Sequence, residues 1–155
     1  MEEVTVVELK PQAVLGTRKK GRYTDIPAML GALCGYPGAM PAFSGPPVFV
    51  CHESSPEEVE KANKEGTADV EVAIPVSKKI KGSKEIKNYE LPGGKMAKIV
   101  HKGPYAKCGP AYEKLFAWIA KNKKKLAGPT REVYLNDPRE VSEMDLLTEI
   151  YAPIG

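Results

Sequence analysis

A single carboxylate interrupts the apolar segment that closes the chain. The last nine residues read LTEIYAPIG, and Glu149 is the only charged residue among them. The segment predicts a β-strand, because β-branched and aromatic residues dominate it and Pro153 is tolerated only near a strand end or edge. Side chains alternate along a strand, so Glu149 and Tyr151 share one face. Such a pair would suit a cationic or polarised apolar molecule, although an ordinary solvent-facing strand has the same pattern.

Aromatic side chains gather in the same half of the sequence as Glu149. They are Tyr105, Tyr112, Trp118, Tyr134 and Tyr151. Their rings would offer flat apolar walls and cation–π faces, while a partly desolvated Glu149 would supply the counter-charge. Ordinary packing in a core or on a helix surface stays an open interpretation for Tyr112 and Trp118. We interpret the group as candidate ligand-binding residues.

Other kinds of reactive site have weaker support. His52 and His101 are the only histidines, and no H-x-x-H spacing occurs, so no metal site is expected. Cys51 and His52 are neighbours, which would point to opposite faces of a strand. Cys51 with His101 is a conceivable nucleophile and base, but a small buried thiol is the commoner role of cysteine. No glycine-rich phosphate loop is present, and we expect no cofactor.

The elements that would position these side chains begin with a strand bent at Pro11, followed by a turn over residues 19–23. An apolar stripe at i, i+3, i+4 and i+7 predicts a helix over residues 26–33, and it includes Leu30. Two strands, over residues 48–51 and 70–76, follow. We interpret residues 54–58, between these strands, as a polar turn, and the lysine-rich stretch from Lys78 to Lys87 as a linker.

The same pattern returns in the second half of the chain. Tyr23 and Tyr105 stand 82 positions apart, as do Pro56 and Pro138. The sequence therefore predicts an α+β fold: a tandem β-α-β-β repeat over about 4–80 and 86–155. It would have pseudo-twofold symmetry, antiparallel sheets and two helices around a central cleft. Leu30 and Phe49 would contribute to that cleft from the first copy. Glu71 is the counterpart of Glu149, and either carboxylate could face the cleft.

Four segments of the second copy resemble the GyrI-like small-molecule-binding domains, a group that includes DNA gyrase inhibitory protein and the effector-binding domains of multidrug-responsive activators. The segments are KGPY at 102–105, AYxxLFxWI at 111–119, EVYLNDP at 132–138 and TEIYAPI at 148–154. The resemblance covers nearly the whole chain, as a single domain over residues 1–155. It implies a cleft for bulky hydrophobic or cationic compounds, with Glu149 at the position of the acidic anchor.

Two further activities follow from the same resemblance. Some stand-alone members hydrolyse cyclopropane-bearing natural products, which implies Glu149 as general base and Tyr112 or Tyr134 as a hydrogen-bond donor. Inhibition of a protein partner such as DNA gyrase is the other alternative. A related fold binds haem, for which His101 would be the axial ligand. Our first hypothesis remains a stand-alone binding protein.

Composition sets the remaining expectations. The 155 residues are 42% hydrophobic and 28% charged, as in soluble globular domains, and no apolar run is long enough for a membrane. Three widely spaced cysteines and the absence of a leader pattern favour the cytoplasm. A net charge of +3 is too small to indicate nucleic-acid binding. The first strand is expected by about Val4, which leaves no room for a helix-turn-helix, so we expect no direct DNA binding.

Overall fold

The computed structural model describes residues 3–53 and 55–154, which form two compact units. Unit 1 comprises Met1–Lys10 with Gly93–Gly155, and unit 2 comprises Pro11–Pro92. The described residues contain three α-helices and eight strands, and the strands within each unit pair antiparallel. The mixed α/β fold with antiparallel strands is as predicted. The expectation of two helices is wrong, because a third lies in the segment interpreted as a turn.

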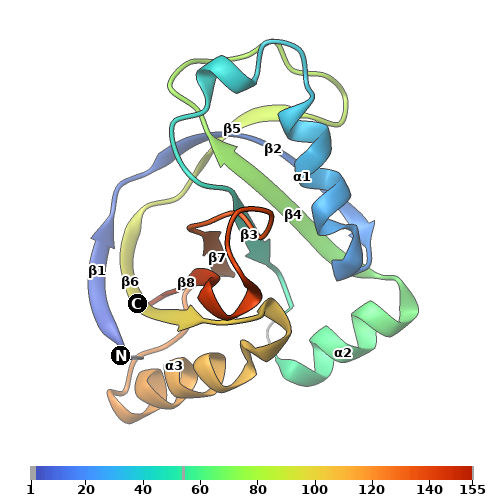
Figure 1. Ribbon diagram of the computed structural model, residues 1–155. Coiled ribbons are helices and arrows are strands. Elements are labelled where there is room, and N and C mark those ends of the chain that lie inside the picture. Colours follow the sequence, from blue (N-terminus) through green and yellow to red (C-terminus); the bar gives the residue numbers. More distant parts are fainter. Residues whose placement is uncertain (1–2, 54, 155) are drawn as a thin grey trace. The chain divides into compact units, whose positions relative to one another are not determined.

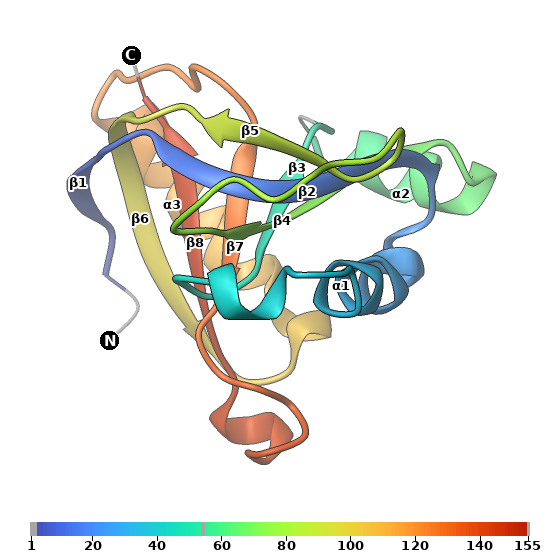
Figure 2. The same cartoon turned by 90° about the horizontal axis from the view of Figure 1, so that it is seen from above.

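Unit 2 is a four-stranded sheet with two helices, in which β5, β2 and β4 run side by side (Figure 2). The order is β5-β2-β4-β3. The strands are β2 (Gln12–Gly21), β3 (Val48–Cys51), β4 (Ala68–Pro75) and β5 (Lys87–Leu91). The helices are α1 (Ile26–Cys34) and α2 (Pro56–Glu65).

The predicted apolar helix is α1, and Pro27 lies in its first turn. Met29 and Leu33 on α1 are buried, and the helix contacts β4. The strand β4 is buried along nearly its whole length, since Val70, Val72 and the side chains between them are all below a tenth exposed. Asp69 and Glu71 are the only charged residues of β4, and Glu71 is buried among its apolar neighbours.

Helix α2 is the element that hydrophobic periodicity fails to predict. The Ser55 side chain caps it by accepting a hydrogen bond from the Glu58 backbone N–H at 3.1 Å. Gly66 ends it in the left-handed conformation, with φ of 71°. The helix carries charged residues on most of its surface, and only Val59 and Ala62, three positions apart and half-buried, form a narrow apolar face. Its start is encoded by the cap, by the proline at its first position and by two acidic residues in its first turn.

Unit 1 is a four-stranded sheet packed on one long helix (Figure 1). The order is β1-β6-β8-β7. The strands are β1 (Thr5–Leu9), β6 (Gly94–Lys102), β7 (Thr130–Tyr134) and β8 (Leu147–Pro153), and the helix is α3 (Gly109–Lys121). The closing strand is β8, as the sequence predicts. Its two neighbours, β6 and β7, pair with it along most of its length.

The core of unit 1 lies between α3 and one face of this sheet. Leu115 and Ile119 on α3 pack against Ile99 on β6 and Ile150 on β8. Leu115, Ile99 and Ile150 are fully buried. The apolar helical stripe and the alternating strand positions therefore meet as their periods require.

Two smaller expectations about the first strand need correction. The predicted strand bent at Pro11 is two strands, and the break falls at Lys10 and Pro11. The segment from Lys19 to Gly21, interpreted as part of a turn, continues β2 and pairs with β4. Both differences arise because strand ends depend on pairing with distant segments, which local composition does not encode.

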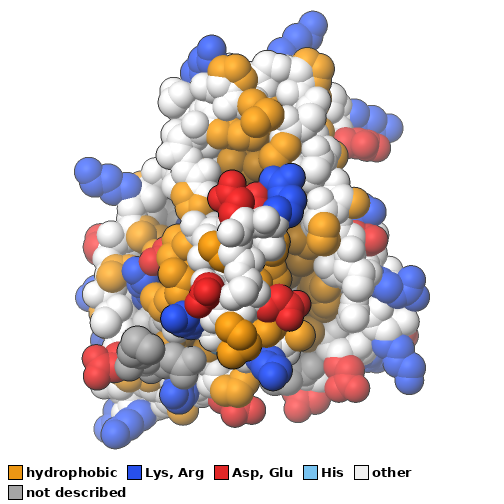
Figure 3. Space-filling view, in the orientation of Figure 1, with side chains coloured by type: hydrophobic (Ala, Val, Ile, Leu, Met, Phe, Trp, Pro, Cys, Tyr) orange, Lys and Arg blue, Asp and Glu red, His pale blue; other side chains and the backbone are white. Residues whose placement is uncertain are grey.

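One face of the described surface carries both charged and hydrophobic side chains. Figure 3 shows one face, on which Lys and Arg side chains are scattered among Asp and Glu, with hydrophobic atoms visible between them. Scattered apolar atoms of this kind are ordinary on protein surfaces. Across residues 3–53 and 55–154, no helix is long and apolar enough to cross a membrane.

Candidate functional site

The alternation of β8 sorts its side chains onto two faces of the unit 1 sheet. Ile150 and Ala152 face α3 and belong to its core. Glu149 and Tyr151 therefore lie on the opposite face. The register places Tyr151 directly across from Lys98 on β6, so Lys98 shares the face of Glu149. A carboxylate, an aromatic ring and an ammonium group thus meet on the face turned away from α3.

The geometry around Glu149 is that of a partly enclosed ion pair. Lys98 Nζ lies 2.6 Å from Glu149 Oε2, and the Tyr151 hydroxyl donates to Oε1 at 2.9 Å. The side chains of Lys98 and Glu149 are 24% and 17% exposed. Lys98 Nζ also lies 5.6 Å from the centroid of the Tyr151 ring, within cation–π range. Burial, and then the carboxylate beside it, raises the pKa of Tyr151. A cation is therefore already held between the carboxylate and the ring.

A second carboxylate cluster lies on the α3 side of the same sheet. Tyr112 on α3 donates its hydroxyl to Glu132 Oε2, and Tyr134 donates to Glu132 Oε1 at 3.3 Å. The Tyr134 ring also packs edge-on against Tyr105, with centroids 5.1 Å apart. Burial raises the pKa of Glu132, while the tyrosine hydrogen bonds and the nearby His101 oppose that rise. We call these residues (Tyr105, Tyr112, Glu132 and Tyr134) the Glu132 cluster.

The Glu132 cluster is bordered by three buried polar side chains. His101 is 5% exposed, and its Nε2 lies 3.0 Å from the Pro104 carbonyl oxygen. Burial raises the pKa of the Cys108 thiol to about 12, which keeps it protonated and poorly nucleophilic. The Thr148 hydroxyl is buried and, within the part of the chain that the structure describes, has no hydrogen-bond partner. Haem ligation through His101 would have to break its contact with Pro104.

The candidate ligand-binding residues therefore fall in separate places. Tyr151 accompanies Glu149, whereas Tyr105, Tyr112 and Tyr134 surround Glu132 on the opposite face. Within unit 1, Glu149 and the Glu132 cluster therefore lie on opposite faces of one sheet. The shared position of these aromatics in one half of the sequence did not predict this division.

The three other candidates pack into hydrophobic surroundings. Trp118 is half-buried and packs against the core of unit 1. Leu30 and Phe49 belong to unit 2. Leu30 is half-buried on α1, and Phe49 is buried with its ring edge-on to Tyr23 at 5.9 Å between centroids.

Sequence reasoning overlooked Glu132 and Lys98. Glu132 stands two residues before Tyr134 on a strand, so alternation alone places the two on one face. That signal was available. Lys98 enters the site only through the pairing register of β6 with β8, which no local pattern specifies.

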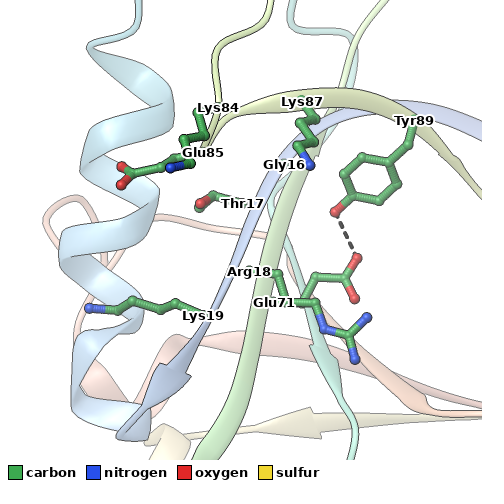
Figure 4. Close-up of a pocket in the computed structure, with 9 residues that line it drawn as sticks. All are labelled: Gly16, Thr17, Arg18, Lys19, Glu71, Lys84, Glu85, Lys87 and Tyr89. Atoms are coloured by element: carbon green, nitrogen blue, oxygen red, sulfur yellow. Dashed lines mark hydrogen bonds between the residues drawn. The ribbon is translucent and has the colours of Figure 1, made fainter.

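Glu71, the counterpart of Glu149, has a network of its own in unit 2. The residue is 7% exposed, and its Oε1 lies 2.7 Å from His52 Nε2. The Tyr89 hydroxyl donates to its Oε2 at 2.7 Å, as Figure 4 shows. Beside it, Arg18 binds Asp69 through two hydrogen bonds of 2.7 and 2.6 Å. Both Glu71 oxygens are thus already engaged.

Metal ligation has no visible basis in the described residues. In residues 3–53 and 55–154, no three His, Cys, Asp or Glu side chains converge as ligands would have to.

The Glu132 cluster should make stability depend on pH. Burial raises the folded-state pKa above the ordinary value of 4.5, so the folded protein holds a proton that the unfolded chain has lost. The free energy of unfolding should therefore fall as pH rises through the raised pKa. In Glu132→Gln, this part of the fall should vanish. Urea unfolding of both proteins from about pH 4 to about pH 8 measures the difference, and parallel profiles would contradict the assignment.

The chain matches one protein family and several solved structures. The family described as the GyrI-like small molecule binding domain matches residues 2–155. A search of curated protein sequences gave no match. The crystal structure of the EcmrR C-terminal domain superposes with a TM-score of 0.80 at 22% identity, covering 100% of this chain and 98% of that one. In the complex of EcmrR with DNA, the match has a TM-score of 0.78 at 22% identity. It covers 98% of this chain, which spans 57% of the EcmrR chain.

Two more distant structures share the fold. A hydrolase encoded by lin2189 from Listeria innocua has a TM-score of 0.67 at 12% identity, with 99% of this chain and 92% of that chain covered. SAV2435 bound to tetraphenylphosphonium has a TM-score of 0.59 at 14% identity, with 99% and 94% covered. At these identities the likeness establishes the fold alone.

Proposed function

Because the chain belongs to the GyrI-like small-molecule-binding domain family, we propose that it binds a hydrophobic small molecule carrying a positive charge, with Glu149 as the polar anchor. The observation that carries this proposal is the position of Lys98. Its ammonium group lies 2.6 Å from the Glu149 carboxylate and 5.6 Å from the centre of the Tyr151 ring. A ligand cation in the same place would meet the same two groups.

Lys98 then acts as an internal counter-ion. A carboxylate that is largely removed from water needs a compensating charge when no ligand is present. A cationic ligand would take over that contact, and the long flexible Lys98 side chain would move its charge towards solvent. The Tyr151 hydroxyl would continue to hold the carboxylate in place through its 2.9 Å hydrogen bond. Binding would therefore be an exchange of one cation for another.

The aromatic side chains of the Glu132 cluster lie on the face of the sheet opposite to Glu149, so they are secondary candidates for ligand contacts. Tyr105 is 37% exposed and is the most accessible ring of the Glu132 cluster. We propose further contacts of the ligand with six other side chains. They are Tyr105, Tyr112, Trp118, Tyr134, Leu30 and Phe49.

Titration with tetraphenylphosphonium tests the proposal, since that cation is bound by SAV2435, which has the same fold. Isothermal titration calorimetry should give saturable binding of the cation and clearly weaker binding of triphenylphosphine oxide, a neutral relative. The charge-assisted contact with Glu149 is the reason for the difference. Equal affinity for the two compounds, or no binding of either, would reject the proposal.

Lys98→Met should strengthen binding of tetraphenylphosphonium by about tenfold, because the ligand no longer competes with an internal cation. Lys95→Met is the matched control, since Lys95 is exposed on the same strand. An unchanged or weaker affinity in Lys98→Met would show that Lys98 does not occupy the ligand's place.

A hydrolase is the second candidate, and the Glu132 cluster favours it. Both tyrosines proposed as hydrogen-bond donors contact Glu132. A carboxyl group whose pKa is raised by burial is suited to proton transfer near neutral pH. Glu132, in place of Glu149, would then move the proton during ring opening by water. Product formation from an electrophilic cyclopropane, lost in Glu132→Gln and kept in Glu149→Gln, would support this candidate.

We also infer that the chain is a tandem β-α-β-β repeat over about 4–80 and 86–155, in which β1 of the first copy pairs in unit 1 and β5 of the second copy pairs in unit 2. The matching order of elements supports this: β5-β2-β4-β3 with α1 in unit 2, and β1-β6-β8-β7 with α3 in unit 1. In each unit a long strand is followed by the helix and then by a short strand.

A cytoplasmic location is supported by three cysteines, none of them in a disulfide.

A further inference from the structure

Unit 2 has a pocket of its own, formed where β5 separates from β2 (Figure 4). The pairing of these strands ends at Gly16 and Lys87, while β2 continues to Gly21. The segment before β5 spans the opening between them. The resulting pocket is half open to solvent and has a volume of about 670 Å³. It is distinct from the Glu149 site, which lies in unit 1.

Basic side chains dominate the lining of this pocket. Arg18, Lys19, Lys84 and Lys87 contribute four positive charges, against the two carboxylates of Glu71 and Glu85. Focused charge of one sign in a concave site attracts ligands of the opposite sign. The lining therefore favours an anion.

The charges in the pocket differ in how far they are already compensated. Arg18 is held by Asp69, and Lys19 lies 3.6 Å from Asp25. By contrast, Lys84 and Lys87 form no ion pair with any carboxylate in residues 3–53 and 55–154. These two ammonium groups are the free positive charges of the pocket.

Glu71 opposes an anion less than its charge suggests. Its two oxygens are taken by His52 and by the Tyr89 hydroxyl, each at 2.7 Å. The hydrogen bonds disperse the negative charge and hold the carboxylate in place at the edge of the positive charges. An anion near Lys84 and Lys87 would meet the ammonium groups first.

Tyr89 supplies an aromatic wall. A Cβ at Gly16 would lie 2.2 Å from the Tyr89 hydroxyl oxygen and 2.8 Å from two ring carbons. The ring therefore lies directly against the backbone of Gly16, where any side chain would displace it. With its hydroxyl committed to Glu71, Tyr89 offers a ligand only its apolar ring.

We propose that this pocket binds an aromatic organic anion, with the acidic group paired to Lys84 and Lys87 and the ring packed on Tyr89. The site would select the opposite charge from the Glu149 site. One domain would then have two binding sites of opposite preference, one in each unit.

The probe for this site is 8-anilinonaphthalene-1-sulfonate, an aromatic sulfonate, added to the full chain. The double variant Lys84→Gln, Lys87→Gln should bind it about tenfold more weakly, because both free ammonium groups are lost. The control is Lys61→Gln, Lys124→Gln, which removes the same charge from exposed positions elsewhere and should bind like the parent. Amide chemical shifts should move at Gly16 and Tyr89 on titration of the parent protein.

Equal affinity of the two double variants, or shifts that avoid Gly16 and Tyr89, would overturn the proposal. Tetraphenylphosphonium separates this site from the other one. Its binding should be unchanged in Lys84→Gln, Lys87→Gln, whereas sulfonate binding should be unchanged in Glu149→Gln. The two titrations therefore show separately whether each proposed site binds its ligand. A sulfonate affinity that falls in Glu149→Gln, and not in the lysine variant, would move the anion away from this pocket and reject it.

Discussion

Glu149→Gln should weaken tetraphenylphosphonium binding by about 1–3 kcal/mol, or roughly 5- to 150-fold, and leave triphenylphosphine oxide nearly unaffected. Glutamine has almost the same shape, so the Tyr151 hydroxyl keeps an acceptor and the packing is preserved. Only the negative charge is lost. The variant also deprives the Lys98 ammonium of the carboxylate that lies 2.6 Å from it in the parent protein. Its repulsion of the incoming cation adds to the loss.

Calorimetric titration of both ligands into both proteins measures this effect. Glu8→Gln is the matched control, since it removes one carboxylate from an exposed position on β1 of the same unit. The control should bind the cation like the parent protein. Similar losses for the charged and the neutral ligand in Glu149→Gln would mean that the residue shapes the site and does not anchor charge.

The combination of Glu149→Gln with Lys98→Met separates two effects that single variants mix. Removing Lys98 alone should tighten cation binding, and removing the carboxylate alone should weaken it. If the two residues act through one ion pair, the change in binding free energy in the double variant will differ from the sum of the changes in the two single variants. Simple additivity would indicate that the ligand cation does not enter the space that Lys98 occupies.

Local pattern predicted those elements whose side chains have a regular period. The helix α1 follows from its i, i+3, i+4 stripe, and the shared face of Glu149 and Tyr151 on the closing strand β8 follows from alternation. Helix α2 was missed because its apolar face is narrow and consists of Val59 and Ala62. Its information lies in Ser55, in the proline after it and in Gly66, which determine where a helix can begin and end.

The candidate site was harder to predict because pairing between distant strands builds it. Glu149 and Tyr151 were correctly placed on one face of a strand. Their partner Lys98 lies about fifty residues earlier and is brought opposite Tyr151 by the register of β6. The sequence groups the aromatics into one half of the chain, yet membership of one half does not determine which face of a sheet a side chain reaches.

The division into two faces changes how aromatic substitutions should be interpreted. Tyr112 donates its hydroxyl to Glu132, so a change at Tyr112 alters a buried carboxyl group as well as any ligand contact. A loss of ligand affinity in Tyr112→Ala would therefore not identify Tyr112 as a wall of the binding site. Tyr112→Phe removes the hydrogen bond and keeps the ring, and comparing the two variants separates these roles.

Leu115→Ala should lower the free energy of unfolding by about 2–5 kcal/mol, the usual cost of truncating a fully buried leucine. Leu115 is 0% exposed and lies at the centre of the contact between α3 and the sheet of unit 1. Its removal would leave a cavity lined by side chains such as Ile99 and Ile150, which belong to two different paired strands. Hydrogen bonding within the sheet limits how far these strands can move to fill it.

Urea unfolding followed by circular dichroism measures the loss, and Lys121→Ala, an exposed position on the same helix, should change stability by less than about 0.5 kcal/mol. The prediction also bears on the site, because α3 carries Tyr112 to Glu132. Weaker packing of α3 should loosen that hydrogen bond and lessen the pH dependence that Glu132 gives to stability. A loss below about 1 kcal/mol would show that α3 is not packed on the sheet as described, and the Glu132 cluster would then lose its framework.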